Sequence, residues 1–208
     1  MSSKTSLWIG AVKPVLASKS ASRRLLLESA GIEVEVEAAP IDERRLEEEF
    51  LERGGASSLL APLLARAKAL DVSARRPQAL CLGADQTLAL EGELFHKAAD
   101  IGEAAQNLRK LAGRTHVLNS ALCIARGGEV MFETTQKALM TMRALDSVAI
   151  RTYLAAAGPA VLSSVGAYQV EGLGIHLFEA IDGDQSTILG LPLLPLLQWL
   201  RGQGCLAL

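Results

Sequence analysis

Hydrophobic and polar residues alternate along this chain in blocks that predict strands and helices in turn. Apolar or alternating runs predict strands over Pro14–Ser18, Ile32–Glu37, Ala79–Leu90, Thr115–Ala125 and Glu129–Met142. Apolar residues at helical spacing predict helices over about Ala21–Ala30, Ile41–Arg53 in part, Ser57–Leu70, Ile101–Ala112, Ser147–Ala156 and Pro192–Arg201. The Gly-rich stretch Ala160–Leu189 is expected to be strand-like. Crossover helices together with hairpins favour an α/β fold with a mixed sheet.

Boundary residues support these assignments. Asp100 is expected to be the N-cap of a helix, with Glu103 three residues later completing a capping box, and Gly113 ends the same helix. Gly127 and Gly128 separate two strand-like runs and predict a hairpin turn.

Length and composition restrict the class of protein. The 208 residues are 50% hydrophobic and 21% charged, without internal repeats or a low-complexity linker, so we expect one folded domain over 1–208. The formal net charge of -2 and an aromatic content of 4% argue against nucleic acid or an anionic membrane as a partner. Any anion site must therefore be built locally.

Cysteine usage and hydropathy bear on location. The three cysteines form no CxxC pair, and Cys81 and Cys123 lie in apolar runs where buried reduced thiols are expected. Met1–Gly10 lacks the features of a signal peptide, and Leu191–Leu200 is too short for a membrane span. A cytoplasmic location is the expectation.

The first candidate for chemistry runs from Leu16 to Arg24. It reads as a strand, a hydroxyl-rich turn with Ser18 and Ser20, and a helix start that carries Arg23 on its apolar face. A helix N-terminus attracts phosphate, and Arg23 is expected to reach past the strand end. The alternative is that Ser20 or Ser22 only caps the helix and Arg23 is a buried structural ion-pair partner.

The second candidate is a scattered set of charged residues. Asp85 lies in an apolar strand, where a carboxylate needs a partner or a metal. Glu43 supplies another hard oxygen ligand for a divalent ion, and Lys68 and Lys97 supply cations for phosphate oxygens. Each also has an ordinary explanation: Lys68 at the edge of an apolar stripe, Lys97 in a loop and Glu43 in an acidic run are all consistent with solvated side chains.

These stretches together resemble the Maf family of nucleotide pyrophosphatases, also called septum-formation inhibitor-like proteins. The matching elements, in the family's order, are Leu16–Leu27, Asp42-Glu43, Leu64–Ala69, Gly83-Ala84-Asp85, His96-Lys97-Ala98, Gly166–Gly172, Asp182-Gly183-Asp184 and Gly190–Leu193. The resemblance covers nearly the whole chain. It departs from the family pattern at Ala21, where proline is usual, and in the His96–Ala98 loop, which keeps only the lysine of G-K-P.

The resemblance implies a twisted mixed sheet flanked by helices, arranged as two lobes with a central cleft. It implies hydrolysis of a nucleoside triphosphate to a monophosphate and pyrophosphate, with Mg²⁺ or Mn²⁺ held by Glu43 and Asp85. Asp85 would also help to deprotonate water, while Lys68 and Lys97 neutralise phosphate charge. The remaining phosphate contacts are assigned to Ser18, Ser20 and Arg23. Family members are often dimers, so a homodimer is compatible with the sequence.

Two further positions bear on the base. Gln86 and Glu171 match the 7-methyl-GTP branch of the family, whereas the pyrimidine-preferring branch usually has threonine and glutamine there. A carboxylate such as Glu171 accepts hydrogen bonds, and guanine offers two adjacent donors on its Watson–Crick edge. The alternative is that Glu171 is a solvated loop residue and Gln86 a packing variant.

Three other functions remain open at this point. The enzyme could be a broad-specificity or dTTP/UTP-preferring house-cleaning pyrophosphatase. It could instead be a nucleotide-binding regulator of septum formation with little turnover. The charged set of Glu43, Lys68, Asp85 and Lys97 favours an enzyme over such a regulator, and a nucleic-acid-binding protein is disfavoured by charge and composition.

Overall fold

The computed structural model describes residues 6–208, which form two compact units. The first comprises residues 6–86, 120–136 and 185–208, and the second comprises 87–119 and 137–184. The N-terminal segment Met1–Gly10, for which no signal peptide is expected, lies outside the described residues over positions 1–5. The expected α/β class is confirmed, as is the expectation of two parts, while a single functional domain over 1–208 stays a prediction.

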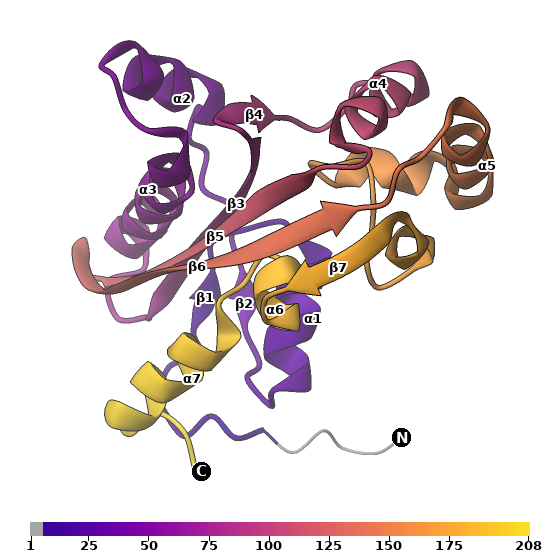
Figure 1. Ribbon diagram of the computed structural model, residues 1–208. Helices are drawn as coiled ribbons and strands as arrows, with labels where there is room; N and C mark the ends of the chain where they lie inside the picture. The colour runs from indigo at the N-terminus through magenta and orange to yellow at the C-terminus, as the bar shows by residue number, and fades with distance from the viewer. Residues whose placement is uncertain (1–5) are drawn as a thin grey trace. The chain divides into compact units, whose positions relative to one another are not determined.

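The described residues form seven strands in one mixed sheet (Figure 1). They are β1 (Val15–Leu16), β2 (Glu35–Val36), β3 (Cys81–Leu90), β4 (Glu93–Phe95), β5 (Thr115–Arg126), β6 (Glu129–Met142) and β7 (Phe178–Asp182). The order is β2-β1-β3-β5-β6-β7, and β4 pairs with β3. β1 is parallel to both of its neighbours, whereas β4 on β3 and β7 on β6 are antiparallel, so the predicted mixed sheet is confirmed.

Seven α-helices are formed by the described residues. They are α1 (Ala21–Ser29), α2 (Glu43–Glu52), α3 (Leu60–Arg75), α4 (Ile101–Leu111), α5 (Ser147–Ala157), α6 (Gln185–Ile188) and α7 (Leu193–Gly202). The predicted capping residue Asp100 accepts a hydrogen bond from the Glu103 amide at 2.8 Å. None of the helices within residues 6–208 is long and apolar enough to cross a membrane.

The prediction for Ala160–Leu189 is wrong. This stretch holds the 3₁₀ helices η2 (Gly158–Ser163) and η3 (Leu173–Leu177) and the short helix α6, and β7 is its one strand. Tight turns explain the difference, because the Gln169 carbonyl accepts from the amides of both Gly172 and Gly174. β4 was not expected either, since three residues carry too little pattern to be recognised.

In the first unit, β1, β3 and β5 are covered on both faces. One face packs Leu16, Leu82 and Leu122 against residues of α1 and α7. The other face packs small residues of β5, such as Ala121, against an alanine stripe of α3 that includes Ala65. Because strand residues point alternately to opposite faces, consecutive residues of β3 serve different layers.

Gly83 allows α3 to lie unusually close to β3. A Cβ atom at this position would come within 2.1 Å of the Ala65 carbonyl oxygen and 2.5 Å of the Ala69 amide nitrogen. Only glycine can occupy such a position without backbone movement. The glycine therefore sets the distance between this helix and this strand, and with it the reach of side chains from one to the other.

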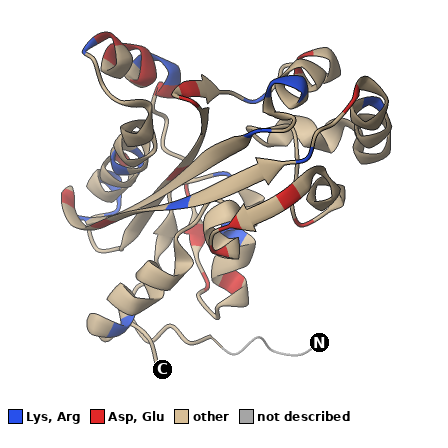
Figure 2. Ribbon diagram, viewed as in Figure 1, with Lys and Arg blue, Asp and Glu red and all other residues tan. Residues whose placement is uncertain are grey.

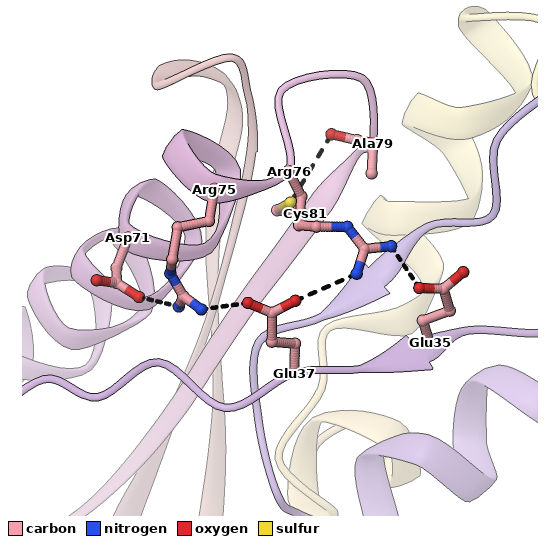
Figure 3. A network of polar contacts seen from close by, with 7 residues as sticks. All are labelled: Glu35, Glu37, Asp71, Arg75, Arg76, Ala79 and Cys81. Atoms are coloured by element: carbon pink, nitrogen blue, oxygen red, sulfur yellow. Dashed lines mark hydrogen bonds and ion pairs between the residues drawn. The ribbon is translucent and has the colours of Figure 1, made fainter.

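An ion-pair network fastens the edge strand β2 to the end of α3 (Figure 3). Arg76 binds both Glu35 and Glu37, and Arg75 binds Glu37 and Asp71. β2 is an edge strand of only two residues, both exposed, and the ion pairs shield this edge of the sheet. Beneath it, in β3, Cys81 is buried, which confirms the expectation for this thiol, and burial raises its pKa to about 11.

In the second unit, a buried aromatic cluster anchors the loop of residues 166–172. His116 of β5 is fully buried, and its Nε2 lies 2.7 Å from the Tyr168 hydroxyl. The Tyr168 ring packs edge-on against Phe178 at 4.8 Å between centroids. Tyr153 of α5 donates to the Ala167 carbonyl at 3.3 Å. The loop is thus tied down by two tyrosines.

Candidate functional site

Asp85 and Lys68 form a buried ion pair in the first unit. Asp85 follows Gly83 by two residues on β3 and so shares its face, the face covered by α3. Lys68 of α3 reaches it, with Nζ 2.5 Å from Asp85 Oδ1, and the two residues are 7% and 9% exposed. The alternative of a solvated Lys68 is therefore wrong, and the buried carboxylate has the partner that its burial requires.

Glu43 binds the same ammonium group. It is the first residue of α2, whose N-cap Asp42 accepts from the Arg45 amide at 3.1 Å. Glu43 Oε2 lies 2.9 Å from Lys68 Nζ, although its side chain is 51% exposed. Figure 2 shows that charged residues dominate α2, as the acidic run predicted. Within this charged surface, Glu43 is the carboxylate that turns to the buried lysine.

Arg23 is held by backbone carbonyls. Its Nε donates to the Gly190 carbonyl at 2.8 Å, and its Nη1 donates to the Ala84 carbonyl at 2.8 Å and to Ser18 Oγ at 3.2 Å. The described residues provide no acceptor for Nη2. Burial lowers the pKa of the guanidinium, and the negative charges of Asp85 and Glu43 oppose that change. Arginine stays protonated in proteins, so this is a fixed positive charge beside two carboxylates.

The two serines before Arg23 have different partners. Ser20 is the N-cap of α1 and accepts from the Arg23 amide at 3.4 Å, as the capping alternative proposed. Ser18 Oγ accepts from the Ser20 amide at 3.2 Å as well as from Arg23. Both hydroxyls therefore shape the turn between β1 and α1, and the Ser18 hydroxyl also binds the guanidinium.

Gln86 turns away from Asp85 to the opposite face of β3. Its Nε2 lies 2.8 Å from Ser120 Oγ, 3.0 Å from the Thr187 carbonyl and 3.0 Å from the Ile188 carbonyl. Sequence reasoning did not identify these partners. The available signal was Ser120, one of several polar residues within the long, mostly buried strand β5.

Lys97 and Glu171 belong to the second unit. Lys97 follows β4 and is exposed, and Glu171 is exposed in the loop of residues 166–172. Burial raises the pKa of Tyr153 to about 12, and the negative charge of Glu171 contributes to this rise. Glu171 is therefore close to the tyrosine that anchors its loop.

The first unit offers oxygen ligands for a divalent cation. No group of three or more His, Cys, Asp or Glu side chains suited to a metal occurs within residues 6–208. Asp85 and Glu43 nevertheless both form ion pairs with the same cation, the Lys68 ammonium group. Mg²⁺ is commonly bound by one or two carboxylates, with substrate phosphates and water completing its shell, and this pair fits that pattern.

The charges of this group also cancel. Arg23 and Lys68 balance Asp85 and Glu43, so a phosphate chain entering here needs further positive charge. A divalent cation brought by or with the ligand supplies it. The oxygen ligands and the charge balance therefore both favour a phosphate chain that binds together with a divalent cation.

Comparison with known proteins agrees with this chemistry. The family model described as "Maf-like protein" matches residues 13–203. A protein of Brucella abortus biovar 1 (strain 9-941) named "7-methyl-GTP pyrophosphatase" is 52% identical over 195 residues, covering 94% of this chain and 98% of its own. A "Nucleoside triphosphate pyrophosphatase" of Rhodopseudomonas palustris (strain BisB18) is 50% identical over 206 residues, covering 97% of this chain and 98% of its own.

A third relative carries the first of these names. The "7-methyl-GTP pyrophosphatase" of Rhizobium etli (strain ATCC 51251 / DSM 11541 / JCM 21823 / NBRC 15573 / CFN 42) is 50% identical over 192 residues, which is 92% of this chain and 96% of that protein. The likeness to all three relatives extends over essentially their full length.

Proposed function

This chain belongs to the Maf-like protein family, and we propose that it is an enzyme that hydrolyses a nucleoside triphosphate to a nucleoside monophosphate and pyrophosphate. The observation that carries the proposal is the buried Lys68 between Asp85 and Glu43, with Arg23 beside them. Buried charges are costly to fold, so the buried pair of Lys68 and Asp85, with Glu43 and Arg23 next to it, favours a chemical role.

We assign Asp85 as the base that accepts a proton from the attacking water. Its Oδ1 is held by Lys68, which leaves Oδ2 as the oxygen that accepts the proton. Lys68 fixes the carboxylate in one orientation and contributes positive charge near the reacting phosphate. Arg23 donates from Nη2 to a phosphate oxygen while its other donors stay on the protein, and Lys97 adds a further cation.

A divalent cation, Mg²⁺ or Mn²⁺, completes the proposed site. Asp85 and Glu43 would hold it together with oxygens of the triphosphate. Its chemistry when bound is to polarise phosphate oxygens and to offset their charge. Exhaustive treatment with EDTA should abolish turnover, and added Mg²⁺ or Mn²⁺ should restore it. Full activity without a divalent ion would contradict this assignment.

The substrate that we favour is a guanine-type nucleotide, 7-methyl-GTP in the first place. Support comes from the names of two relatives and from Glu171, an exposed carboxylate on an anchored loop. A carboxylate can accept both donors of the guanine Watson–Crick edge, and the positive charge of 7-methylguanine adds to the attraction.

The proposed function is tested by measuring pyrophosphate release from 7-methyl-GTP, GTP, dTTP, UTP and CTP. We expect turnover with at least one nucleotide and the highest kcat/KM for 7-methyl-GTP. Tight binding of these nucleotides without pyrophosphate release would instead identify a nucleotide-binding regulator. Release of single phosphates in place of pyrophosphate would exclude cleavage between the α and β phosphates.

A further inference from the structure

Glu171 lies in a tight turn of the second unit. The turn runs from Gln169 to Gly172, whose amide donates to the Gln169 carbonyl at 3.1 Å. The same carbonyl accepts from the Gly174 amide at 3.0 Å, and a Cβ atom at Gly174 would come within 2.5 Å of it. The Glu171 side chain is exposed and is not held by packing, so the backbone of this turn sets the direction of its carboxylate.

The backbone just before this turn is strained at Ala167. This buried residue has a φ of +58°, which a residue with a Cβ atom rarely adopts. Such a conformation costs free energy and persists only where the surrounding structure holds it. The Ala167 amide donates to the Ser164 carbonyl at 3.2 Å, and the Ala167 carbonyl accepts from the Tyr153 hydroxyl at 3.3 Å. The form of the loop therefore depends on contacts outside the turn itself.

Tyr168 makes the next of these contacts. Its ring folds back over Gly166, where a Cβ atom would collide with the ring. The ring also meets Phe178 edge-on, and the hydroxyl lies 2.7 Å from His116 Nε2. Because His116 belongs to the long strand β5, this hydrogen bond joins the residue before the turn to the sheet.

The bond between Tyr168 and His116 is a polar contact in a buried place. Burial lowers the pKa of His116 to about 4, so the imidazole is neutral near pH 7, and a neutral ring can bond a hydroxyl in either tautomer. Its Nδ1 is buried without a partner among the described residues, which is costly. An apolar pair could fill the same space without this cost. A buried polar bond of this kind favours one fixed arrangement of the loop over added stability.

We propose that Tyr168, held by His116, is a positioning residue for base recognition, which fixes the turn that carries Glu171. The proposal rests on the proposed function in one respect, the assignment of Glu171 to the base. Two consequences separate this role from a merely structural one. Loss of the bond should change the preference among nucleotides, and it should do so only while Glu171 is present to be misplaced.

The test is Tyr168→Phe, which removes the hydroxyl and keeps the ring over Gly166. Calorimetry with Mg²⁺ present measures the binding of inorganic tripolyphosphate and of the α,β-methylene analogues of 7-methyl-GTP and dTTP, which cannot be cleaved between these phosphates. We expect the affinity for the 7-methyl-GTP analogue to fall about fivefold, the scale of one hydrogen bond. The affinities for the dTTP analogue and tripolyphosphate should change by less than about twofold.

Two further variants complete the comparison. Thr141→Val is the matched control, because it removes a hydroxyl that lies 2.9 Å from the Thr115 hydroxyl in the same unit, and it should change none of these affinities. His116→Leu removes the proposed bond from its other side and should repeat the result of Tyr168→Phe.

A double-mutant cycle shows whether Tyr168 acts through Glu171. In a Glu171→Gln background, adding Tyr168→Phe should leave the ratio of the two analogue affinities within about twofold of its starting value. An equal change of this ratio in both backgrounds would overturn the proposal. A loss of affinity for tripolyphosphate as large as that for the 7-methyl-GTP analogue would also overturn it, because that ligand has no base.

A last measurement does not depend on turnover. Hydrogen exchange at the amides of Gly172 and Gly174, which donate to the Gln169 carbonyl, should accelerate at least about fivefold in Tyr168→Phe and stay unchanged in Thr141→Val. Unchanged exchange in Tyr168→Phe would refute the positioning role even in an active enzyme. Faster exchange with an altered nucleotide preference, in a protein that releases no pyrophosphate, would support the positioning role and refute only the proposed hydrolysis.

Discussion

At the scale of single residues, Lys68 shows what pattern alone cannot decide. Helical spacing places it at the edge of an apolar stripe, where long charged side chains are usually solvated. Its burial follows from Gly83 on another element, which lets the helix approach the strand. The sequence was sufficient to select Asp85 as a carboxylate in need of a partner, and the fold supplied the partner.

We predict that Asp85→Asn lowers kcat for pyrophosphate release by at least ~10²-fold and leaves the fold intact. Asparagine keeps the shape and still accepts a bond from Lys68, whose charge Glu43 continues to balance. It cannot take a proton from water and is a poor ligand for a hard cation. Steady-state kinetics and circular dichroism on the purified variant provide the measurement. Asp100→Asn, which retains an effective helix cap, should behave as wild type.

His116 makes stability depend on pH. Burial lowers its pKa to about 4 in the folded protein, against about 6.5 in an unfolded chain. The unfolded state therefore binds more protons between these values, so the contribution is fully present above pH 6.5 and is lost as the pH falls towards 4. Between about pH 7.5 and about pH 5 the loss should be about 2 kcal/mol.

The measurement is urea unfolding of wild type and His116→Gln at both pH values. Groups common to the two proteins cancel, so the wild type should lose about 2 kcal/mol more than the variant on acidification. The buried Nδ1, which has no partner among the described residues, makes a charged imidazolium especially unfavourable here. Parallel losses in the two proteins would show that His116 is not the group responsible.

At the scale of elements, local signals located the helices and missed the irregular segment. Asp100 and Ser20 correctly indicate the starts of helices, because a capping side chain forms a hydrogen bond with a residue close to it in the sequence. The prediction of strands in Ala160–Leu189 is wrong because turns and 3₁₀ helices bury the apolar residues of this stretch. Such segments leave no regular spacing of apolar residues in the sequence. The partners of Gln86 were equally invisible, since they lie 34 to 102 positions away.

The contact between α3 and β3 gives a prediction at this scale. Gly83→Ala should destabilise the protein by about 1–3 kcal/mol, because a Cβ cannot fit against the Ala65 carbonyl and the helix must move outwards. Moving α3 also carries Lys68 away from Asp85, so kcat should fall more than stability alone explains. Thermal unfolding and kinetics below the transition would show both effects. Gly202→Ala, where a Cβ meets nothing within 4 Å, is the matched control.

At the scale of the whole molecule, the proposed roles divide between the two units. The first unit contains Arg23, Lys68 and Asp85, which are assigned to the phosphates and the water. The second contains Lys97, which is assigned to phosphate charge, and Glu171 on its anchored loop. Family resemblance alone selects residues in both units, because short motifs are recognisable as strings of sequence. The anchoring of the loop cannot be predicted in the same way, since His116 and Tyr168 are 52 positions apart.

Because Glu171 and Asp85 are assigned different roles, we predict that base preference can be changed without loss of hydrolysis. Glu171→Gln should weaken kcat/KM for 7-methyl-GTP and GTP by ~1–3 kcal/mol, the scale for losing a charged hydrogen-bond partner. An amide presents a donor beside its acceptor and suits uracil and thymine, so dTTP and UTP should be spared or improved. Because the loop is held by Tyr153 and Tyr168, the substitution should leave its backbone in place.

The five-nucleotide panel on wild type and Glu171→Gln measures this directly, and Glu179→Gln, an exposed carboxylate on β7, controls for loss of charge. A changed ranking with preserved turnover of at least one nucleotide would assign base choice to Glu171. A uniform loss across all five nucleotides would instead place Glu171 with the groups that serve the phosphates. If dTTP or UTP is the best wild-type substrate and the ranking does not change, the guanine preference is wrong, while the pyrophosphatase activity stands on Asp85 and Lys68.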